Sequence, residues 1–171
     1  MKILNPQILL SFLSLILGVI TPFSVALAKN TQKYTHSSNS QQIVVNKTEF
    51  GVRIVNSARK VNFFPTTIVP LKQGDAYGWR IKLNNYQGKV QWREVLTLPQ
   101  APETWITQDH KNFSISKDGK TAISQRTETP VNGVIENFWT ISSGDPLGKY
   151  QIEVYIDKRL IGTFAFEIVP F

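Results

Sequence analysis

Two glutamates interrupt the apolar faces of expected strands, and they are the residues that come nearest to a catalytic pair. Glu94 falls on the face that Trp92 occupies, and Glu136 lies within the run 134–142. Glycoside hydrolysis needs two carboxyl groups across a cleft, so one interpretation is an envelope polysaccharide hydrolase using Glu94 or Glu136. The interpretation that we favour brings each carboxylate to water at a strand end or a bulge, near 93–95 for Glu94. Without that bulge Glu94 needs a buried partner, because an unpaired carboxylate in a core is costly.

Metal and nucleophile chemistry lack their usual side chains in this sequence. The chain has no cysteine and only two histidines, His36 in a polar segment and His110 in the loop QDHK. A metal site takes several His, Cys or carboxylate ligands, and a His-dependent nucleophile would rest on His110 alone. The cluster at 144–146, Gly-Asp-Pro, has neither phosphate-loop spacing nor the oxygen ligands of a calcium site, so it is interpreted as a turn. We therefore expect no catalytic residue, no metal and no cofactor.

Trp105 is the first candidate for contact with a ligand. It lies in the long loop PQAPETWITQDHK, between two expected strands. An exposed tryptophan can stack on a sugar or anchor a partner, and Trp is enriched at binding hot spots. The alternative is that the ring folds back to cover an open end of the fold.

Basic residues suggest a second candidate surface. Residues 47–93 are strongly basic and residues 94–171 are mildly acidic, within a net charge of +7 for the whole chain. Arg80, Lys82 and Arg93 occupy the polar sides of two successive strands, so a hairpin would present them as one basic strip. Such a strip favours an anionic partner. The alternative is that the two halves of the chain interleave in space and the charges serve only solubility.

These side chains must be positioned by strands, because apolar residues recur with period two from Ile43 onward and no helical period appears. Turn residues such as Asp118-Gly119 separate the apolar runs. The pattern predicts an all-β fold, a single antiparallel immunoglobulin-like β-sandwich of about 7–9 strands. The expected strands cover 49–55, 66–69, 77–83, 90–98, 112–116, 121–127, 134–142, 149–156 and 160–169.

The last two strands carry the clearest local signals. Gly148-Lys149-Tyr150 stands at the start of the penultimate strand, where a tyrosine corner places a Tyr that bonds back to nearby backbone. The residues 157–159, Asp-Lys-Arg, then join two alternating runs that can both face one core. The Gly and Pro residues before the corner are explained by turn geometry.

The N-terminus has the pattern of a secretory signal peptide over residues 1–28. Lys2 precedes the apolar run 8–20, and Ala26-Leu27-Ala28 forms a small-x-small box, so cleavage is expected after Ala28. The alternative is an uncleaved membrane anchor. No second apolar segment approaches the length that spans a bilayer.

The rest of the chain divides into an arm and a domain. Residues 29–42 are polar and are expected to form a flexible arm, and residues 43–171 are expected to form the β-sandwich. Without cysteine the domain has no disulfides and depends on its apolar core. The signal pattern predicts an exported protein, periplasmic or secreted, that touches the membrane only if the signal segment is retained.

Several short blocks of turn glycines and core aromatics together resemble a bacterial exported β-sandwich domain of unknown function (family 3859), over about residues 48–169. The resemblance implies a small exported β-sandwich module, and since that family carries no established activity, no functional residue transfers. The family's final hairpin has a turn glycine, which 157–159 lacks. The blocks are Phe50-Gly51-Val52, Val69-Pro70, Gly74, Tyr77-Gly78-Trp79, Leu98-Pro99, 148–155, Leu160 and 166–169.

The sequence therefore predicts a non-catalytic binding or accessory module of the cell envelope. Its expected partner is an unidentified protein or an envelope polysaccharide, contacted by Trp105 or by the basic residues Arg80, Lys82 and Arg93. Nucleic acid is not expected, because an exported domain without a recognition motif lacks the features of such binders. The hydrolase and a purely structural module are the alternatives.

Overall fold

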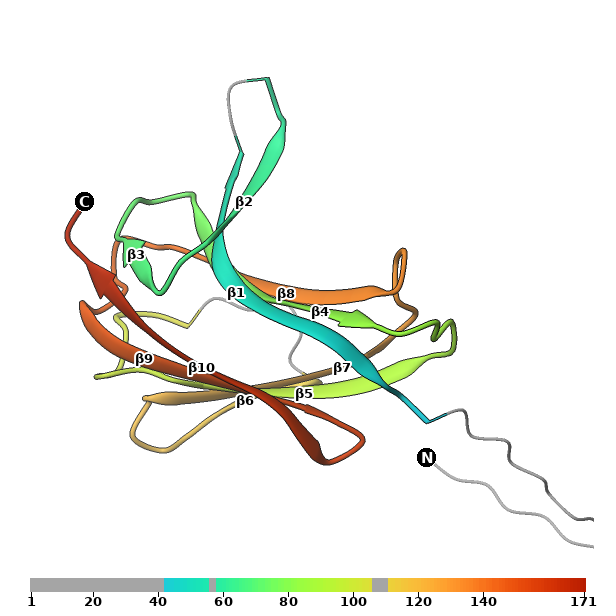
Figure 1. The fold of residues 1–171 in the computed structure, drawn as a ribbon. Coiled ribbons are helices and arrows are strands. Elements are labelled where there is room, and N and C mark those ends of the chain that lie inside the picture. The colour runs from blue at the N-terminus through green and yellow to red at the C-terminus, as the bar shows by residue number, and fades with distance from the viewer. Residues whose placement is uncertain (1–41, 56–57, 106–110) are drawn as a thin grey trace, which may run out of the picture. The chain divides into compact units, whose positions relative to one another are not determined.

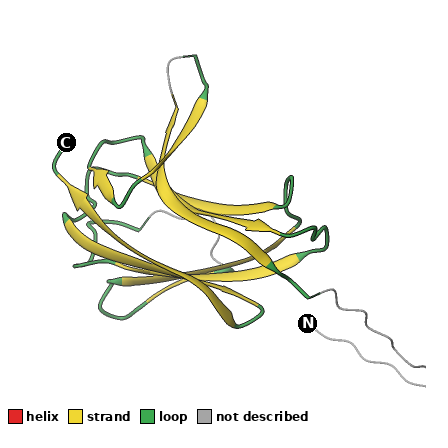
Figure 2. Ribbon diagram, viewed as in Figure 1, coloured by secondary structure: helices red, strands yellow, loops and turns green. Residues whose placement is uncertain are grey.

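The computed structural model of the protein describes residues 42–55, 58–105 and 111–171 (Figure 1). The expected signal peptide (1–28) with its cleavage site Ala28, and nearly all of the expected arm (29–42), lie outside the described residues. Every regular element of the described part is a strand (Figure 2). In that part no helix is long and apolar enough to cross a membrane.

The first layer is a four-stranded antiparallel sheet with the order β2-β1-β4-β8. Its longer strands are those in which apolar and polar residues alternate. The β1–β2 hairpin projects beyond the body of the sandwich (Figure 1). The bounds are β1 Val45–Val55, β2 Val61–Pro65, β4 Ala76–Leu83 and β8 Val134–Thr140.

The second layer is a six-stranded sheet with the order β3-β10-β9-β5-β7-β6. It is antiparallel except at one edge, where the short β3 runs parallel to β10. The bounds are β3 Ile68–Pro70, β5 Val90–Thr97, β6 Phe113–Ile115, β7 Thr121–Glu128, β9 Gly148–Ile156 and β10 Arg159–Val169. The two packed sheets confirm the predicted all-β sandwich. The described residues form ten strands, because β2 adds to the nine expected segments.

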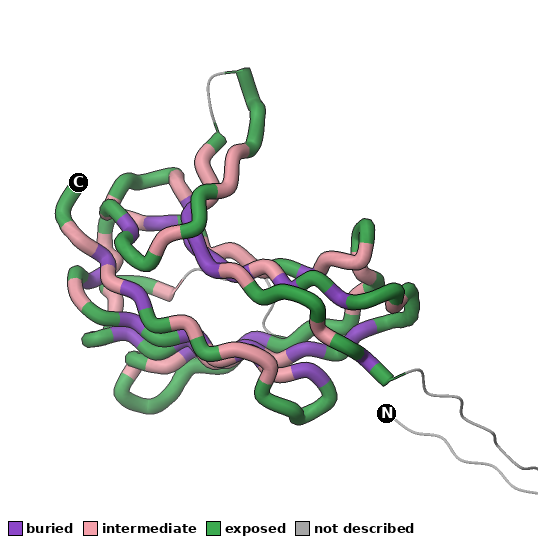
Figure 3. Tube along the Cα trace, viewed as in Figure 1, coloured by how far each residue is buried: buried purple, intermediate pink, exposed green. Residues whose placement is uncertain are grey.

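Buried residues occur along the strands of both sheets (Figure 3), and they form one hydrophobic cluster. Trp79 of β4 and Trp92 of β5 meet edge to face, with ring centroids 5.2 Å apart, and both are almost completely buried. Phe50 of β1 stacks on Phe166 of β10 at 4.4 Å. Burying aromatic surface from both layers is the main stabilising contribution available to a domain without disulfides.

Two local predictions for the last strands are confirmed. The Tyr150 hydroxyl donates a hydrogen bond of 2.7 Å to the Pro146 carbonyl, which is the bond of a tyrosine corner. Asp157 and Lys158 form the two-residue turn between β9 and β10, with φ of 48° and 67°. Both angles lie in the left-handed region. Asp157 is a residue that such a turn prefers at its first position, whereas Lys158 stands where the turn prefers glycine.

One expected pairing is wrong. The strands that we expected to form a hairpin around 84–88 are β4 and β5, and they belong to different sheets. β4 pairs with β1 and β8, whereas β5 pairs with β7 and β9. Alternation identifies which side of a strand faces the core, but it does not say which sheet the strand joins.

Candidate ligand pocket

Glu94 lies in the middle of the core. β5 pairs with β7 and β9 without a register shift, so no bulge turns Glu94 outward, and its side chain is completely buried. The favoured prediction of a carboxylate that reaches water is therefore wrong for this residue. The physical reason is that donors are available inside, so burial does not leave the carboxylate unpaired.

Three side chains from the opposite sheet donate hydrogen bonds to this carboxylate. Trp79 Nε1 and Asn137 Nδ2 donate to Oε2, the latter at 3.0 Å, and Trp139 Nε1 donates to Oε1 at 2.6 Å. Burial raises the pKa of Glu94, while the bonds from Asn137, Trp79 and Trp139 oppose that rise. All three partners are donors, which suits an ionised, acceptor-only carboxylate.

Glu94 fixes two side chains that form part of a pocket wall. Asn137 and Trp139 come from β8, at the edge of the four-stranded sheet, and both line one hollow between the two sheets. Their bonds to a buried carboxylate hold the amide and the indole in set orientations. Glu94 is thus a positioning residue behind the pocket.

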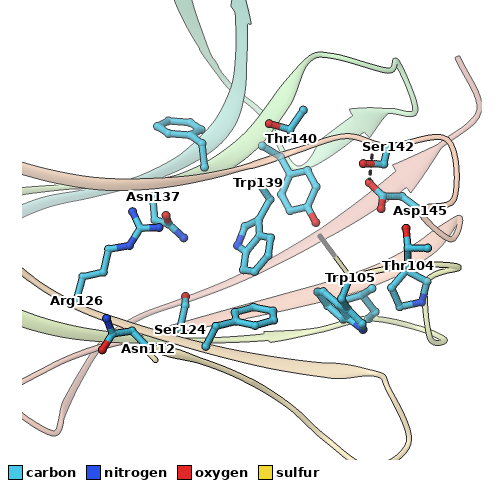
Figure 4. A pocket seen from close by; sticks show the side chains of 15 residues that line it. Thr104, Trp105, Asn112, Ser124, Arg126, Asn137, Trp139, Thr140, Ser142 and Asp145 are labelled. Carbon is cyan, nitrogen blue, oxygen red and sulfur yellow. Dashed lines mark hydrogen bonds between the residues drawn. The ribbon is translucent and has the colours of Figure 1, made fainter. Parts of the chain in front are cut away.

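The pocket lies between β8 of one sheet and β6 and β7 of the other, and its cavity volume is about 450 Å³. In Figure 4, Asn137 and Trp139 face Ser124 and Arg126 across the hollow. Small-molecule sites commonly have volumes of about 300–1,000 Å³, so the hollow has the size of a ligand site. The lining residues that the argument uses are Tyr77, Trp105, Phe113, Ser124, Asn137 and Trp139.

Trp105 closes one end of this hollow. Its indole N–H donates to the Gly119 carbonyl at 2.9 Å, and its ring meets Trp139 edge-on at 6.0 Å and Phe113 at 6.1 Å. The ring is half-buried, so it folds back over the open side of the sandwich, as in the alternative interpretation. It also belongs to the pocket lining, so a role in contacting a ligand stays a prediction.

One buried hydroxyl group on the pocket has no partner. The Ser124 Oγ has no hydrogen bond to any described residue, although Ser124 is only 9% exposed. A buried polar group without a partner costs about 1–3 kcal/mol, so this position calls for an explanation. Tyr77, which is 3% exposed, brings a second hydroxyl-bearing side chain to the pocket lining, and burial raises its pKa.

The charged residues of the pocket are exposed or already engaged. The Arg126 side chain is exposed, and its guanidinium lies 5.8 Å from the centre of the Trp92 ring. Asp145 Oδ2 accepts a 3.0 Å bond from the Ser142 backbone N–H, and burial raises the pKa of this carboxyl. The interior of the hollow is therefore lined by aromatic rings, hydroxyls and an amide rather than by an unpaired charge.

Glu136 lies away from the pocket. It is exposed and pairs with Arg80 Nε at 3.1 Å on the outer face of the four-stranded sheet. The contact is short enough for an ion pair, but Arg80 Nε makes no hydrogen bond, so the N–H is not aligned with the carboxylate. Glu94 points to the inner face, so the structure does not bring the two candidate glutamates together.

The three candidate basic residues do not form one strip. Arg80 and Lys82 lie on β4, where Arg80 also approaches the Phe63 ring at 5.1 Å and Lys82 donates to the Asn132 carbonyl. Arg93 lies on β5 in the other sheet, 4.2 Å from the centre of the Tyr155 ring. The strip prediction is wrong as a single surface because it required β4 and β5 to pair. Whether any of the three residues binds a partner stays a prediction.

No group of three His, Cys, Asp or Glu residues that could hold a metal occurs among residues 42–55, 58–105 and 111–171. His36 and His110 lie outside those ranges.

The sequence interpretation missed the pocket hydroxyls and the role of Asn137. A signal for them existed, because Ser124 follows Ala122 on one face of β7, and Asn137 lies between Ile135 and Trp139 on one face of β8. Polar residues at core positions of two strands indicate either buried hydrogen bonds or a cavity. Which of the two applies depends on what the opposite sheet brings to each position.

Comparison with known proteins places the fold in a family but supplies no activity. The profile of a family described as the PM0630 beta sandwich domain matches residues 48–169. This match confirms the predicted resemblance to a β-sandwich domain of unknown function. No curated protein matches the sequence.

Two solved structures are similar in fold only. An immunoglobulin-like protein from Pseudomonas aeruginosa has 18% identity and a TM-score of 0.49, with 75% of this chain and 97% of that chain covered. The alkylpurine DNA glycosylase AlkC from Pseudomonas fluorescens, bound to DNA containing an abasic site analog, has 10% identity and a TM-score of 0.32. That match covers 71% of this chain and 30% of the glycosylase. Neither similarity bears on function.

Proposed function

The chain belongs to the PM0630 beta sandwich domain family, and from this premise we propose that it is an exported, non-catalytic module that binds a small ligand in the pocket between β8 and β6–β7. The observation that carries the proposal is the hollow of about 450 Å³ on which the buried Ser124 hydroxyl lacks a partner. A bound ligand would supply the missing hydrogen bond.

The arrangement of carboxylates favours binding over catalysis. A hydrolase of the kind considered from the sequence needs two carboxyl groups across a cleft. Glu94 is shut in by Trp79, Trp139 and Asn137, and Glu136 pairs with Arg80 on the outer face. Fold alone does not decide activity, so the argument rests on this geometry.

Export is proposed from the N-terminal pattern of residues 1–28. Mass spectrometry of the protein recovered from the extracytoplasmic fraction tests it, and the expected N-terminus is Lys29. A chain that keeps Met1 and stays with the membrane would instead support the anchor, and a chain found only in the cytoplasm would overturn export. In the exported setting, the expected partner is an envelope polysaccharide or an unidentified protein.

Photo-crosslinking in the producing cell tests binding at the pocket. A photoreactive amino acid replaces Thr104, an exposed residue of the pocket lining, and in a matched control it replaces Thr67, an exposed loop threonine outside the lining. We expect a covalent adduct of defined mass at position 104 and none at position 67. Equal labelling at both positions, or no adduct at either, would overturn the proposal.

A further inference from the structure

The aromatic wall of the pocket has a fixed orientation before any ligand arrives. The indole N–H of Trp105 is tied to Gly119, and that of Trp139 is tied to Glu94. Phe113 contacts both indoles at centroid distances of 6.1 and 6.0 Å. Because both N–H groups are used by the protein, the indoles offer a ligand carbon surface rather than hydrogen-bond donors.

The polar wall offers groups that both donate and accept. The buried Ser124 hydroxyl lacks a partner, and Tyr77 also lines the hollow. Each of these hydroxyls can donate one hydrogen bond and accept others. Asn137 uses its Nδ2 on Glu94, and its carbonyl oxygen is an acceptor. A ligand that carries hydroxyls can satisfy these groups, because each of its hydroxyls also donates and accepts.

Charge at the pocket argues against a strongly ionic ligand. Asp145 is engaged by the Ser142 backbone, and Glu94 is enclosed behind Trp139. Arg126 is exposed at the pocket, so its attraction for an anion is screened by solvent. The interior is therefore suited to a neutral molecule.

Resting on the proposed binding function, we propose that the ligand is a neutral sugar, a short saccharide unit whose apolar C–H face packs on the Trp105–Trp139–Phe113 wall while its hydroxyls bond to Tyr77 and Ser124. An apolar surface with a few convergent polar groups is the general form of a small-ligand site. A hydroxyl-bearing ligand is the class that matches both walls at once. Glu94 acts on this site indirectly, by holding Trp139 and Asn137.

The test titrates the mature protein with three neutral disaccharides, N,N′-diacetylchitobiose, cellobiose and maltose, by isothermal calorimetry and tryptophan fluorescence. Glucuronate and indole are the charged and the purely apolar controls. We expect one disaccharide to saturate the protein, and the controls to bind more weakly. Tyr77→Phe and Ser124→Ala each remove one hydroxyl and should weaken sugar binding by about 5- to 10-fold, the value of one hydrogen bond.

Matched controls separate binding from folding. Tyr150→Phe removes a hydroxyl that bonds to Pro146, and Ser114→Ala removes one from the exposed face of β6; neither residue lines the pocket, so both should leave sugar affinity unchanged. Ser124→Ala should unfold at the same or a higher urea concentration than the wild type, because it deletes an unpartnered group. The urea midpoint of Tyr77→Phe is measured beside it, so that a loss of folding is told apart from a loss of binding.

The outcomes distinguish this inference from the proposed function. A crosslinked adduct at position 104 with no disaccharide bound at millimolar concentration would show that the pocket takes another class of ligand, and the sugar assignment would be wrong. Neither adduct nor sugar binding would overturn both proposals. Sugar binding that Tyr77→Phe and Ser124→Ala leave unchanged would show that the sugar binds elsewhere, and the inference would also fail.

Discussion

Tyr77 and Tyr150 touch edge to face in one core, with ring centroids 6.1 Å apart, yet they have different surroundings. The Tyr150 hydroxyl is bonded to the Pro146 carbonyl, whereas Tyr77 lines the pocket. The contrast extends to the regions around them. We call the region of β1, β9 and β10 the closed half, and the region of β6, β7 and β8 the open half.

The two halves differ in how tightly their aromatic rings pack and in whether their buried hydroxyls are hydrogen-bonded. In the closed half, Phe166 stacks on Phe50 and Tyr150, and the buried hydroxyl is satisfied. In the open half, aromatic rings line a hollow and Ser124 lacks a partner. Unsatisfied groups and incomplete packing cost stability, and proteins keep them mainly where a site needs them. The difference teaches that dense aromatic packing and the open hollow lie in separate halves of one sandwich.

The largest predicted effect is a loss of unfolding free energy when an aromatic ring is removed, and it should be greater in the closed half than in the open half. Phe166→Ala removes a ring that is 4% exposed and contacts three other rings, so we expect a loss of about 3–5 kcal/mol in the free energy of unfolding. Phe113→Ala, at the half-buried pocket wall, should cost about half as much, because part of that ring already faces open space. Urea unfolding measures both. Equal losses would contradict the division into two halves.

The next effect concerns Glu94, which links the core to the open half. Glu94→Gln replaces an acceptor with a group that also donates, so one of the three donors loses its partner, and we expect a cost of about 1–3 kcal/mol at pH 7. Glu128→Gln is the control. Glu128 accepts one indole bond, from Trp92 at 2.7 Å, and the amide oxygen of glutamine can keep it. A larger cost for Glu128→Gln would contradict this account.

Glu94 also predicts a pH dependence. Its pKa is raised in the folded state by burial, so the folded chain binds this proton more tightly than the unfolded chain. The stability from this group is fully present below its ordinary pKa of 4.5 and is lost as the pH rises through the raised value. Unfolding free energies between pH 4 and 8 should therefore show an advantage of the wild type over Glu94→Gln that shrinks with rising pH. An advantage that grows with pH would mean that the three donors outweigh burial.

A smaller effect compares the two tyrosines directly. Tyr150→Phe leaves the buried Pro146 carbonyl without its donor, so we expect a loss of about 1 kcal/mol in unfolding free energy. Tyr77→Phe removes a hydroxyl from the pocket lining rather than the donor to a buried backbone carbonyl, so we expect a smaller loss. Paired urea titrations give the difference. An equal or larger loss for Tyr77→Phe would show that its hydroxyl already has a stabilising role in the unliganded protein.

The smallest effect is a gain in the closed half. Lys158 holds a φ of 67° in the β9–β10 turn, which glycine adopts without steric cost, so Lys158→Gly should stabilise the protein by about 0.5–1 kcal/mol. Lys117→Gly, in the β6–β7 turn but without a positive φ, is the matched control and should not stabilise. The change in thermal midpoint measures both. No gain for Lys158→Gly would indicate that the turn carries no strain.

The sequence predicted the elements that depend on local pattern. Period-two alternation predicted most of the strands, and Gly148-Lys149-Tyr150 predicted the tyrosine corner. Both predictions succeeded because each depends only on residues that are close together in the sequence. The candidate site was found only in part. Trp105 was singled out and does line the pocket, whereas Arg80, Lys82 and Arg93 were grouped on a hairpin that does not exist.

By itself, the sequence determined that Glu94 and Trp92 share one face of a strand, and it required a buried partner for Glu94 if no bulge intervened. Only the tertiary structure decided that the partners are Trp79, Asn137 and Trp139. The reason is that periodicity fixes the direction of a side chain relative to its own strand. What the side chain meets depends on how the two sheets pack, and strands distant in the chain set that packing. For the same reason the pocket could not be predicted from the sequence, since its walls come from both sheets and meet only when the sandwich has formed.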